Sequence, residues 1–70
     1  MKFGISVVFY ERGYWSKAYT FLSELPIEKG AKVLVPAGRW YGVAKVMSCT
    51  ENPVLNPEIT YKSVIEVLKL

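Results

Sequence analysis

Two short stretches of the sequence place arginine close to adjacent aromatic side chains. Arg39 directly precedes one Trp-Tyr pair, and Arg12 lies two residues before a Tyr-Trp pair. A guanidinium beside aromatic faces can contact a phosphate or a carboxylate while a nucleobase or a partner side chain stacks on a ring. The candidate binding residues are therefore Arg12, Tyr14, Trp15, Arg39, Trp40 and Tyr41.

The residue types that most enzymes use are largely missing. The sequence has no His, no Asp and a single Cys, and its glutamates are scattered with no spacing that pairs two carboxylates. General base, metal and paired-carboxylate chemistry therefore lack their usual residues. Cys49 has no neighbouring cations to activate it, so we expect a small buried or rim hydrophobe. We predict a protein that is not an enzyme and has no cofactor and no metal.

Length and composition predict one small folded domain over residues 1–70. The chain is 51% hydrophobic and 21% charged, which is enough apolar surface to offset the entropy of ordering. One cysteine allows no internal disulfide and fits a reducing compartment, so we expect a cytoplasmic protein. The apolar start of the chain is too short and too interrupted to cross a membrane, and we expect no membrane contact. The net charge of +3 permits an anionic partner without requiring one.

Alternation of apolar and polar residues favours strands over helices. A helix over residues 16–24 competes with the second strand, since Ser16 could cap it. Gly13 suits a hairpin loop, Gly42 suggests a bulge or sharp bend, and Gly30 or Gly38 should take a positive φ. The expected strands are residues 2–10, 15–22, 31–36, 40–48 and 61–68, with an exposed loop over 51–58.

Five short strands separated by turns indicate an all-β fold. A small five-stranded SH3-like barrel is the expected architecture, because closing the sheet removes its free edges. An OB-like barrel is the alternative. From one alternating face of each strand we predict this core: Ile5, Val7, Phe9, Val33, Val35, Val43, Ile65 and Val67.

The orientation of the aromatic pairs decides whether they can bind a partner. If the two hairpins lie on one side of the barrel, exposed aromatics could form a shared surface like those that hold extended peptides. Strand alternation favours the opposite interpretation, in which one Trp and one Tyr fill core volume. Both interpretations remain open from the sequence.

The middle of the chain resembles two known groups. The stretch Gly30–Val46, read with Leu25-Pro26 before it and the Tyr61–Ile65 segment after it, is similar to small tailed-phage proteins of unassigned function. It also resembles the N-terminal 3′-DNA-binding domain of the primosomal helicase PriA. The resemblance covers residues 18–68 and implies a compact, phage-encoded β-barrel. It does not carry over DNA-end recognition, because the chain has no Asp to match an acidic pocket residue and carries Trp40-Tyr41 instead.

Two functional hypotheses follow. The first is a non-catalytic module, encoded by a phage, that binds a host protein of replication, transcription or defence through an aromatic and basic surface in the host cytoplasm. The alternative is a barrel that binds single-stranded DNA or a DNA end. The modest positive charge favours the protein partner, because a phosphate track usually gathers more Lys and Arg on one face. The sequence does not determine an oligomeric state.

Overall fold

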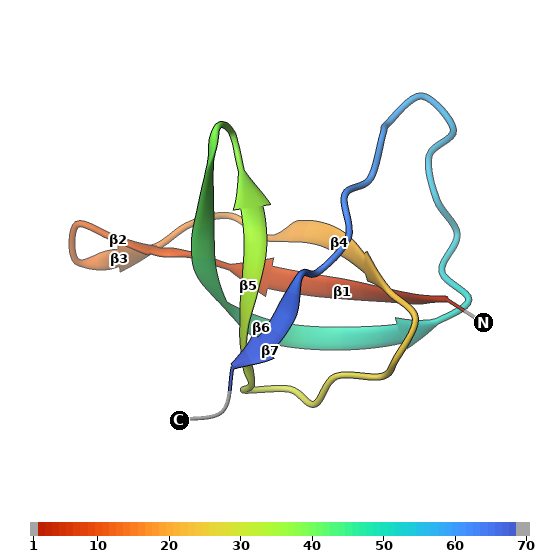
Figure 1. The fold of residues 1–70 in the computed structure, drawn as a ribbon, viewed down its shortest axis with the longest axis horizontal. Helices are drawn as coiled ribbons and strands as arrows, with labels where there is room; N and C mark the ends of the chain where they lie inside the picture. Colours follow the sequence, from red (N-terminus) through yellow and green to blue (C-terminus); the bar gives the residue numbers. More distant parts are fainter. Residues whose placement is uncertain (1, 69–70) are drawn as a thin grey trace.

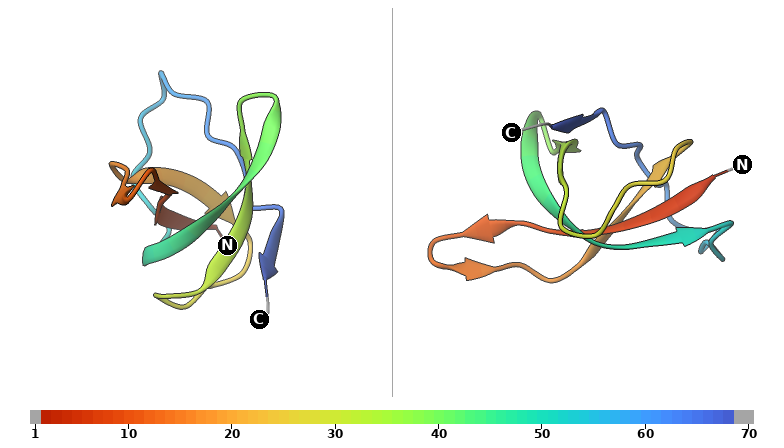
Figure 2. Two further views of the ribbon diagram at one scale, coloured as in Figure 1. Left: turned by 90° about the vertical axis from the view of Figure 1, so that its left-hand side faces the viewer. Right: turned by 90° about the horizontal axis from the view of Figure 1, so that it is seen from below.

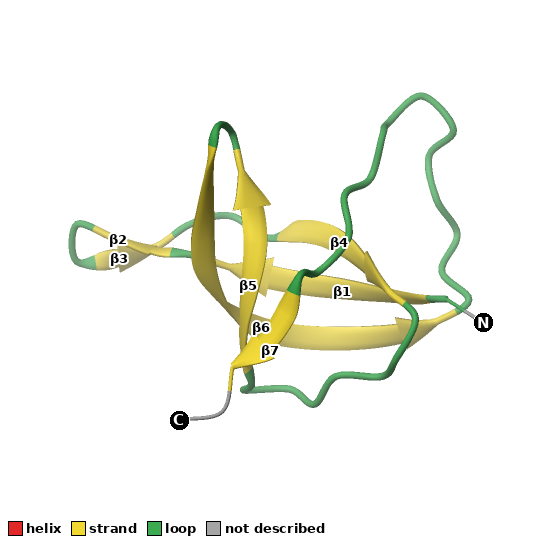
Figure 3. Ribbon diagram, in the orientation of Figure 1, coloured by secondary structure: helices red, strands yellow, loops and turns green. Residues whose placement is uncertain are grey.

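The computed structural model describes residues 2–68. Within them the chain folds into β-strands joined by turns and loops (Figures 1 and 3). No helix forms within these residues, so the competing helix over 16–24 is wrong and the all-β prediction is confirmed. The part of the chain that the structure describes also contains no helix that could cross a membrane. The strands are β1 (Phe3–Val8), β2 (Tyr10–Glu11), β3 (Tyr14–Trp15), β4 (Tyr19–Ser23), β5 (Lys32–Ala37), β6 (Trp40–Glu51) and β7 (Glu66–Leu68).

The first hairpin has two parts. β1 pairs antiparallel with β4, and the chain between them continues outward as the two-stranded β2–β3 ribbon. Arg12 and Gly13 form the turn of this ribbon with φ values of 48° and 90°. Positive φ at both central residues is typical of a tight hairpin turn whose twist matches its strands. Figures 1 and 2 show the ribbon projecting beyond the rest of the molecule.

The second hairpin joins β5 and β6 through Gly38 and Arg39. Gly38 has φ 62° and Gly30 has φ 93°, which confirms the predicted positive φ at both. The pairing continues without a shift through Gly42, so of the predicted bulge or sharp bend the bulge does not form. Gly42 instead lets the Phe9 ring pack closely, because a Cβ at this position would lie 3.1 Å from Phe9 Cε1. The register shift lies further along β6, where Ser6 pairs with Ser48 and Val7 with Val46.

The core lies on one face of the main sheet. Four predicted core residues (Ile5, Val7, Val33 and Val35) are fully buried, and Phe9 is half-buried against them. The predictions for Val43, Ile65 and Val67 are wrong, since all three are exposed. Within the described residues, the buried hydrophobic side chains are Ile5, Val7, Phe21, Ile27, Val33, Val35, Ala44 and Val46.

The hairpin turn explains the error in β6. Pairing of Ala37 with Trp40 across the turn places Val33 opposite Ala44. The inward face of β6 therefore carries Ala44 and Val46, and Val43 belongs to the outward face. Because the inward face includes the small residues Gly42 and Ala44, alternation in the sequence does not identify it as the core face.

The main sheet has the strand order β4-β1-β6-β5-β7, with β4 and β7 at its edges. It contains five strands, as predicted, but it is not closed into a barrel. The long connection after β6 runs over residues 52–65, and the last strand is confined to Glu66–Leu68 rather than 61–68. Before β7, this connection forms one parallel bridge, Leu22 to Ser63, with β4.

Candidate functional site

All four aromatic side chains of the two predicted clusters are exposed. The exposed fractions are 66% for Tyr14, 49% for Trp15, 78% for Trp40 and 69% for Tyr41. The interpretation in which one aromatic of each pair fills the core is therefore wrong. The pairs do alternate across their strands, but each lies in a part of a hairpin that extends past the core, so neither face is covered.

Of the four, Trp15 has both an aromatic and a cationic contact. It pairs across the ribbon with Tyr10, and the two rings meet edge to face with centroids 5.0 Å apart. The Nζ of Lys45, from the middle of β6, lies 5.5 Å from the Trp15 ring centroid. The edge-to-face contact stabilises the ribbon itself, and the cation over the indole links the ribbon to β6.

A shallow recess of about 150 Å³ lies between the ribbon and β6. Its wall combines aromatic and aliphatic side chains with the stems of two lysines. We name these side chains together the Trp15 surface. Its residues are Tyr10, Trp15, Lys32, Val43 and Lys45.

The two lysines of the Trp15 surface lie directly opposite each other. Lys32 of β5 and Lys45 of β6 are Cα partners in the antiparallel pair. Like charges at directly opposed positions destabilise a sheet. An anionic group placed over the recess would relieve this repulsion, so the arrangement favours a partner with a carboxylate or a phosphate.

Tyr41 extends the Trp15 surface along β6. Tyr41, Val43 and Lys45 are alternate residues of β6, so their side chains share the outward face of the strand. Trp40 has the opposite orientation and sits at the end of the inward face. Tyr41 thus joins the surface, and Trp40 lies at its margin.

The two hairpin ends do not meet. Figures 1 and 2 show the β2–β3 ribbon and the end of the β5–β6 hairpin pointing in different directions. Arg12 and Arg39 lie in these two turns, and Tyr14 stands on the other side of the ribbon from Trp15, paired with Glu11. The predicted surface shared by the two hairpin ends therefore does not form, and of the four aromatic side chains Trp15 is the one that lines the recess beside β6.

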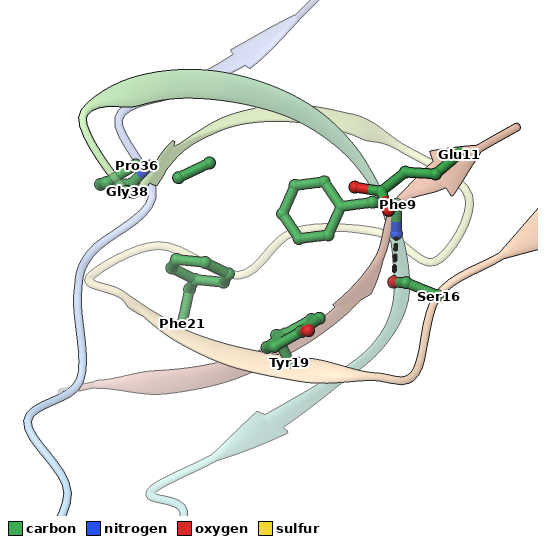
Figure 4. A pocket seen from close by; sticks show the side chains of 8 residues that line it. Phe9, Glu11, Ser16, Tyr19, Phe21, Pro36 and Gly38 are labelled. Carbon is green, nitrogen blue, oxygen red and sulfur yellow. Dashed lines mark hydrogen bonds between the residues drawn. The ribbon is translucent and has the colours of Figure 1, made fainter.

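A second hollow, of about 340 Å³, opens on the other side of the ribbon base. Figure 4 shows the rings of Phe9, Tyr19 and Phe21 around it, with Pro36 opposite. The backbone N–H of Phe9 donates to Ser16 Oγ at 2.9 Å, and the Phe9 and Tyr19 rings meet edge to face. This hollow is the open end of the core.

The described residues offer little for metal or thiol chemistry. Between residues 2 and 68, no three His, Cys, Asp or Glu side chains gather in a way that could hold a metal ion. Cys49 is exposed, not buried, at the far end of β6.

Comparisons with known proteins do not assign this fold to a family. No family model matches the chain, and neither a curated protein nor a solved structure matches it. The resemblance to phage proteins and to the PriA domain therefore stays a prediction.

The opposed lysines give a testable expectation. Lys32→Glu should raise the free energy of unfolding by roughly 0.5 kcal/mol, because a repelling cross-strand pair becomes an attracting one. Urea denaturation measures the difference, and Lys29→Glu, an exposed turn substitution with the same charge change, is the matched control. The gain should shrink at high salt, which screens both the repulsion and the attraction. Equal stability of the two variants at low salt would show that Lys32 and Lys45 do not repel each other.

Proposed function

We propose that the chain is a non-catalytic module that binds a protein partner through the Trp15 surface. The observation that carries this proposal is the exposed Trp15 ring, fixed between Tyr10 and Lys45 beside the exposed Val43. Rigid, exposed aromatic side chains beside aliphatic ones are typical of protein interfaces, where they add contact area at a small entropic cost.

The chemistry of the recess suggests the nature of the partner. Lys32 and Lys45 frame an apolar floor, so a segment that presents an acidic residue next to an apolar one fits it best. The carboxylate would lie between the two ammonium groups while the apolar side chain covers Trp15. Such complementarity would also speed association at low salt.

The biological setting follows from the sequence resemblance and is part of the proposal. We propose a phage-encoded factor that binds a host protein of replication, transcription or defence in the host cytoplasm. Arg39 and Trp40 would lie at the margin of the contact, whereas Arg12 and Tyr14 would lie outside it.

For the fold, we propose an SH3-like barrel that is partly open. The support is the way residues 62–64 approach β4. Leu22 donates its N–H to the Lys62 carbonyl at 2.9 Å and accepts from the Val64 N–H at 2.9 Å. These two hydrogen bonds bring the chain leading to β7 against β4, which is the edge that a closed barrel would join.

A second candidate function is the binding of single-stranded nucleic acid. The same surface favours it, because a base can stack on Trp15 while Lys32 and Lys45 contact a phosphate. We rank it second, because two lysines of the described residues frame the recess and a nucleic-acid groove usually follows several phosphates.

Affinity capture and a direct titration separate the two candidates. The immobilised chain is incubated with a bacterial lysate, with and without nuclease, and a fluorescent oligothymidine is titrated into the free chain. We expect a retained protein that survives nuclease treatment, and weak oligothymidine binding at physiological salt. Loss of all retained protein after nuclease, together with tight oligothymidine binding that falls steeply with salt, would favour the nucleic-acid candidate. Neither retained protein nor bound oligothymidine would contradict both.

A further inference from the structure

A groove opens where β7 separates from the end of β4. It has a volume of about 430 Å³ and shares no residue with the Trp15 surface. One wall comes from the turn after β4, where Leu25 is exposed and Ile27 is buried. The other wall is β7 with the residue before it, and it presents the exposed Ile65 and Val67.

The backbone beside this groove is an open sheet edge. β7 pairs with β5 on one side and stands last in the strand order, so its other side faces no strand of the sheet. An unpaired strand edge is a template for another extended chain. β7 is three residues long and includes Glu66, but it contains neither proline nor lysine, so its main-chain groups stay available for pairing.

The charge of the groove differs from that of the whole chain. Glu24 lies on the β4 side and Glu66 on the β7 side, and no Lys or Arg among residues 2–68 lines the groove. Two carboxylates on opposite walls of an apolar groove therefore occur in a protein whose net charge is +3.

We propose that this groove binds an extended segment of a partner protein, which adds to the edge of β7 as a further strand and presents Lys or Arg to Glu24 and Glu66. Alternate side chains of an added strand point to one face. Its apolar residues would cover Ile65 and Val67, and its main chain would pair with the free edge of β7. Main-chain hydrogen bonds give affinity in this mode of recognition, and side chains give specificity.

The charges favour a basic segment over two other occupants. A second copy of this chain would bring the same two carboxylates to the groove, and like charges across an interface are unfavourable. A nucleic acid would place phosphates beside Glu24 and Glu66. A strand that alternates basic and apolar residues avoids both of these like-charge contacts.

A designed peptide provides the probe. The peptide is acetyl-Lys-Val-Lys-Val-Lys-Val-Lys-amide, and its binding to the full chain is followed by amide chemical shifts in NMR. We expect shifts at Glu66–Leu68 and Leu25, and slower hydrogen exchange at the β7 amides. An otherwise identical peptide that is N-methylated at every residue should bind at least tenfold more weakly, because neither of its edges can donate main-chain hydrogen bonds.

Matched variants test the charge requirement. Glu24→Lys with Glu66→Lys should weaken binding of the peptide by about tenfold, whereas Glu28→Lys with Glu58→Lys changes the net charge equally and should leave it almost unchanged. All four glutamates are exposed, so both double variants should fold. A peptide with Glu in place of every Lys should not bind the parent chain.

Several results would overturn the proposal. They are the absence of any shift at β7, equal binding of the N-methylated peptide, and equal weakening by the two double variants. Chemical-shift changes confined to Trp15 and Lys45 would show that the peptide binds the Trp15 surface instead. A dimer in sedimentation that depends on β7 would show that a second copy of the chain occupies the groove. Because the two surfaces share no residue, failure here leaves the proposed function of the Trp15 surface standing, and the reverse also holds.

Discussion

Val46→Ala should lower the free energy of unfolding by about 2 kcal/mol, whereas Val43→Ala should change it by less than about 0.5 kcal/mol. The two substitutions remove the same atoms from the same strand. Val46 is fully buried and Val43 is 53% exposed. Truncation at Val46 therefore removes buried contacts and leaves a cavity, while truncation at Val43 removes contacts mostly with water.

Urea denaturation of the two variants measures this difference directly. The slope of the transition should match that of the parent in both, which shows that stability alone has changed. Val35→Ala serves as a positive control, because Val35 is also fully buried and was predicted from the sequence to be a core residue. A larger loss of unfolding free energy for Val43→Ala than for Val46→Ala would show that Val43, and not Val46, faces the core.

The outcome for β6 also shows what the sequence could predict. The turn at Gly38 and Arg39 could be located from its glycine, and a two-residue turn pairs Ala37 with Trp40. Counting back along both strands from this pair places Lys32 opposite Lys45. That count would have revealed the opposed lysines and the inward position of Ala44. The prediction of Val43 as a core residue instead placed the face with Tyr41 and Val43 inward, which is the wrong register.

The end of the chain could not be predicted in the same way. Tyr61, Ile65 and Val67 alternate as in a half-buried strand, yet pairing with β5 begins only at Glu66. Residues 62–64 first approach β4, and Ile65 then donates its N–H to the Leu34 carbonyl at 2.9 Å. A segment that changes its partner strand within a few residues depends on long-range geometry, which local alternation does not record.

The candidate site was predicted in its residue types but not in its arrangement. Trp15 and Tyr41 were among the candidate binding residues and both are exposed, whereas Arg12 and Arg39 lie in the two separate turns. The contact between Trp15 and Lys45 joins residues thirty positions apart and depends on how the ribbon leaves β1. Tyr10 belongs to the surface through its cross-strand pair with Trp15, which a count from the Arg12-Gly13 turn could have found.

Within the ribbon, adjacent residues provide a matched test of the proposed function. Tyr14 and Trp15 are both exposed, and both come from β3, but only Trp15 lines the recess beside Lys45. Truncation of either side chain should leave the core intact, because neither packs against it. A difference in binding between the two variants would therefore report which side of the ribbon meets the partner.

Trp15→Ala should lower the affinity for the captured protein partner by at least ~2 kcal/mol, or roughly thirtyfold, and Tyr14→Ala should lower it by less than about threefold. A buried tryptophan at the centre of an interface commonly has an effect of this size, whereas a side chain facing away does not. The double variant Arg39→Ala, Trp40→Ala should have an intermediate effect, because these residues lie at the margin of the Trp15 surface. Isothermal titration calorimetry measures all three affinities, and denaturation midpoints confirm that each variant is folded. If the double variant loses more affinity than Trp15→Ala, the contact is centred on the end of the β5–β6 hairpin and the surface proposed here is wrong.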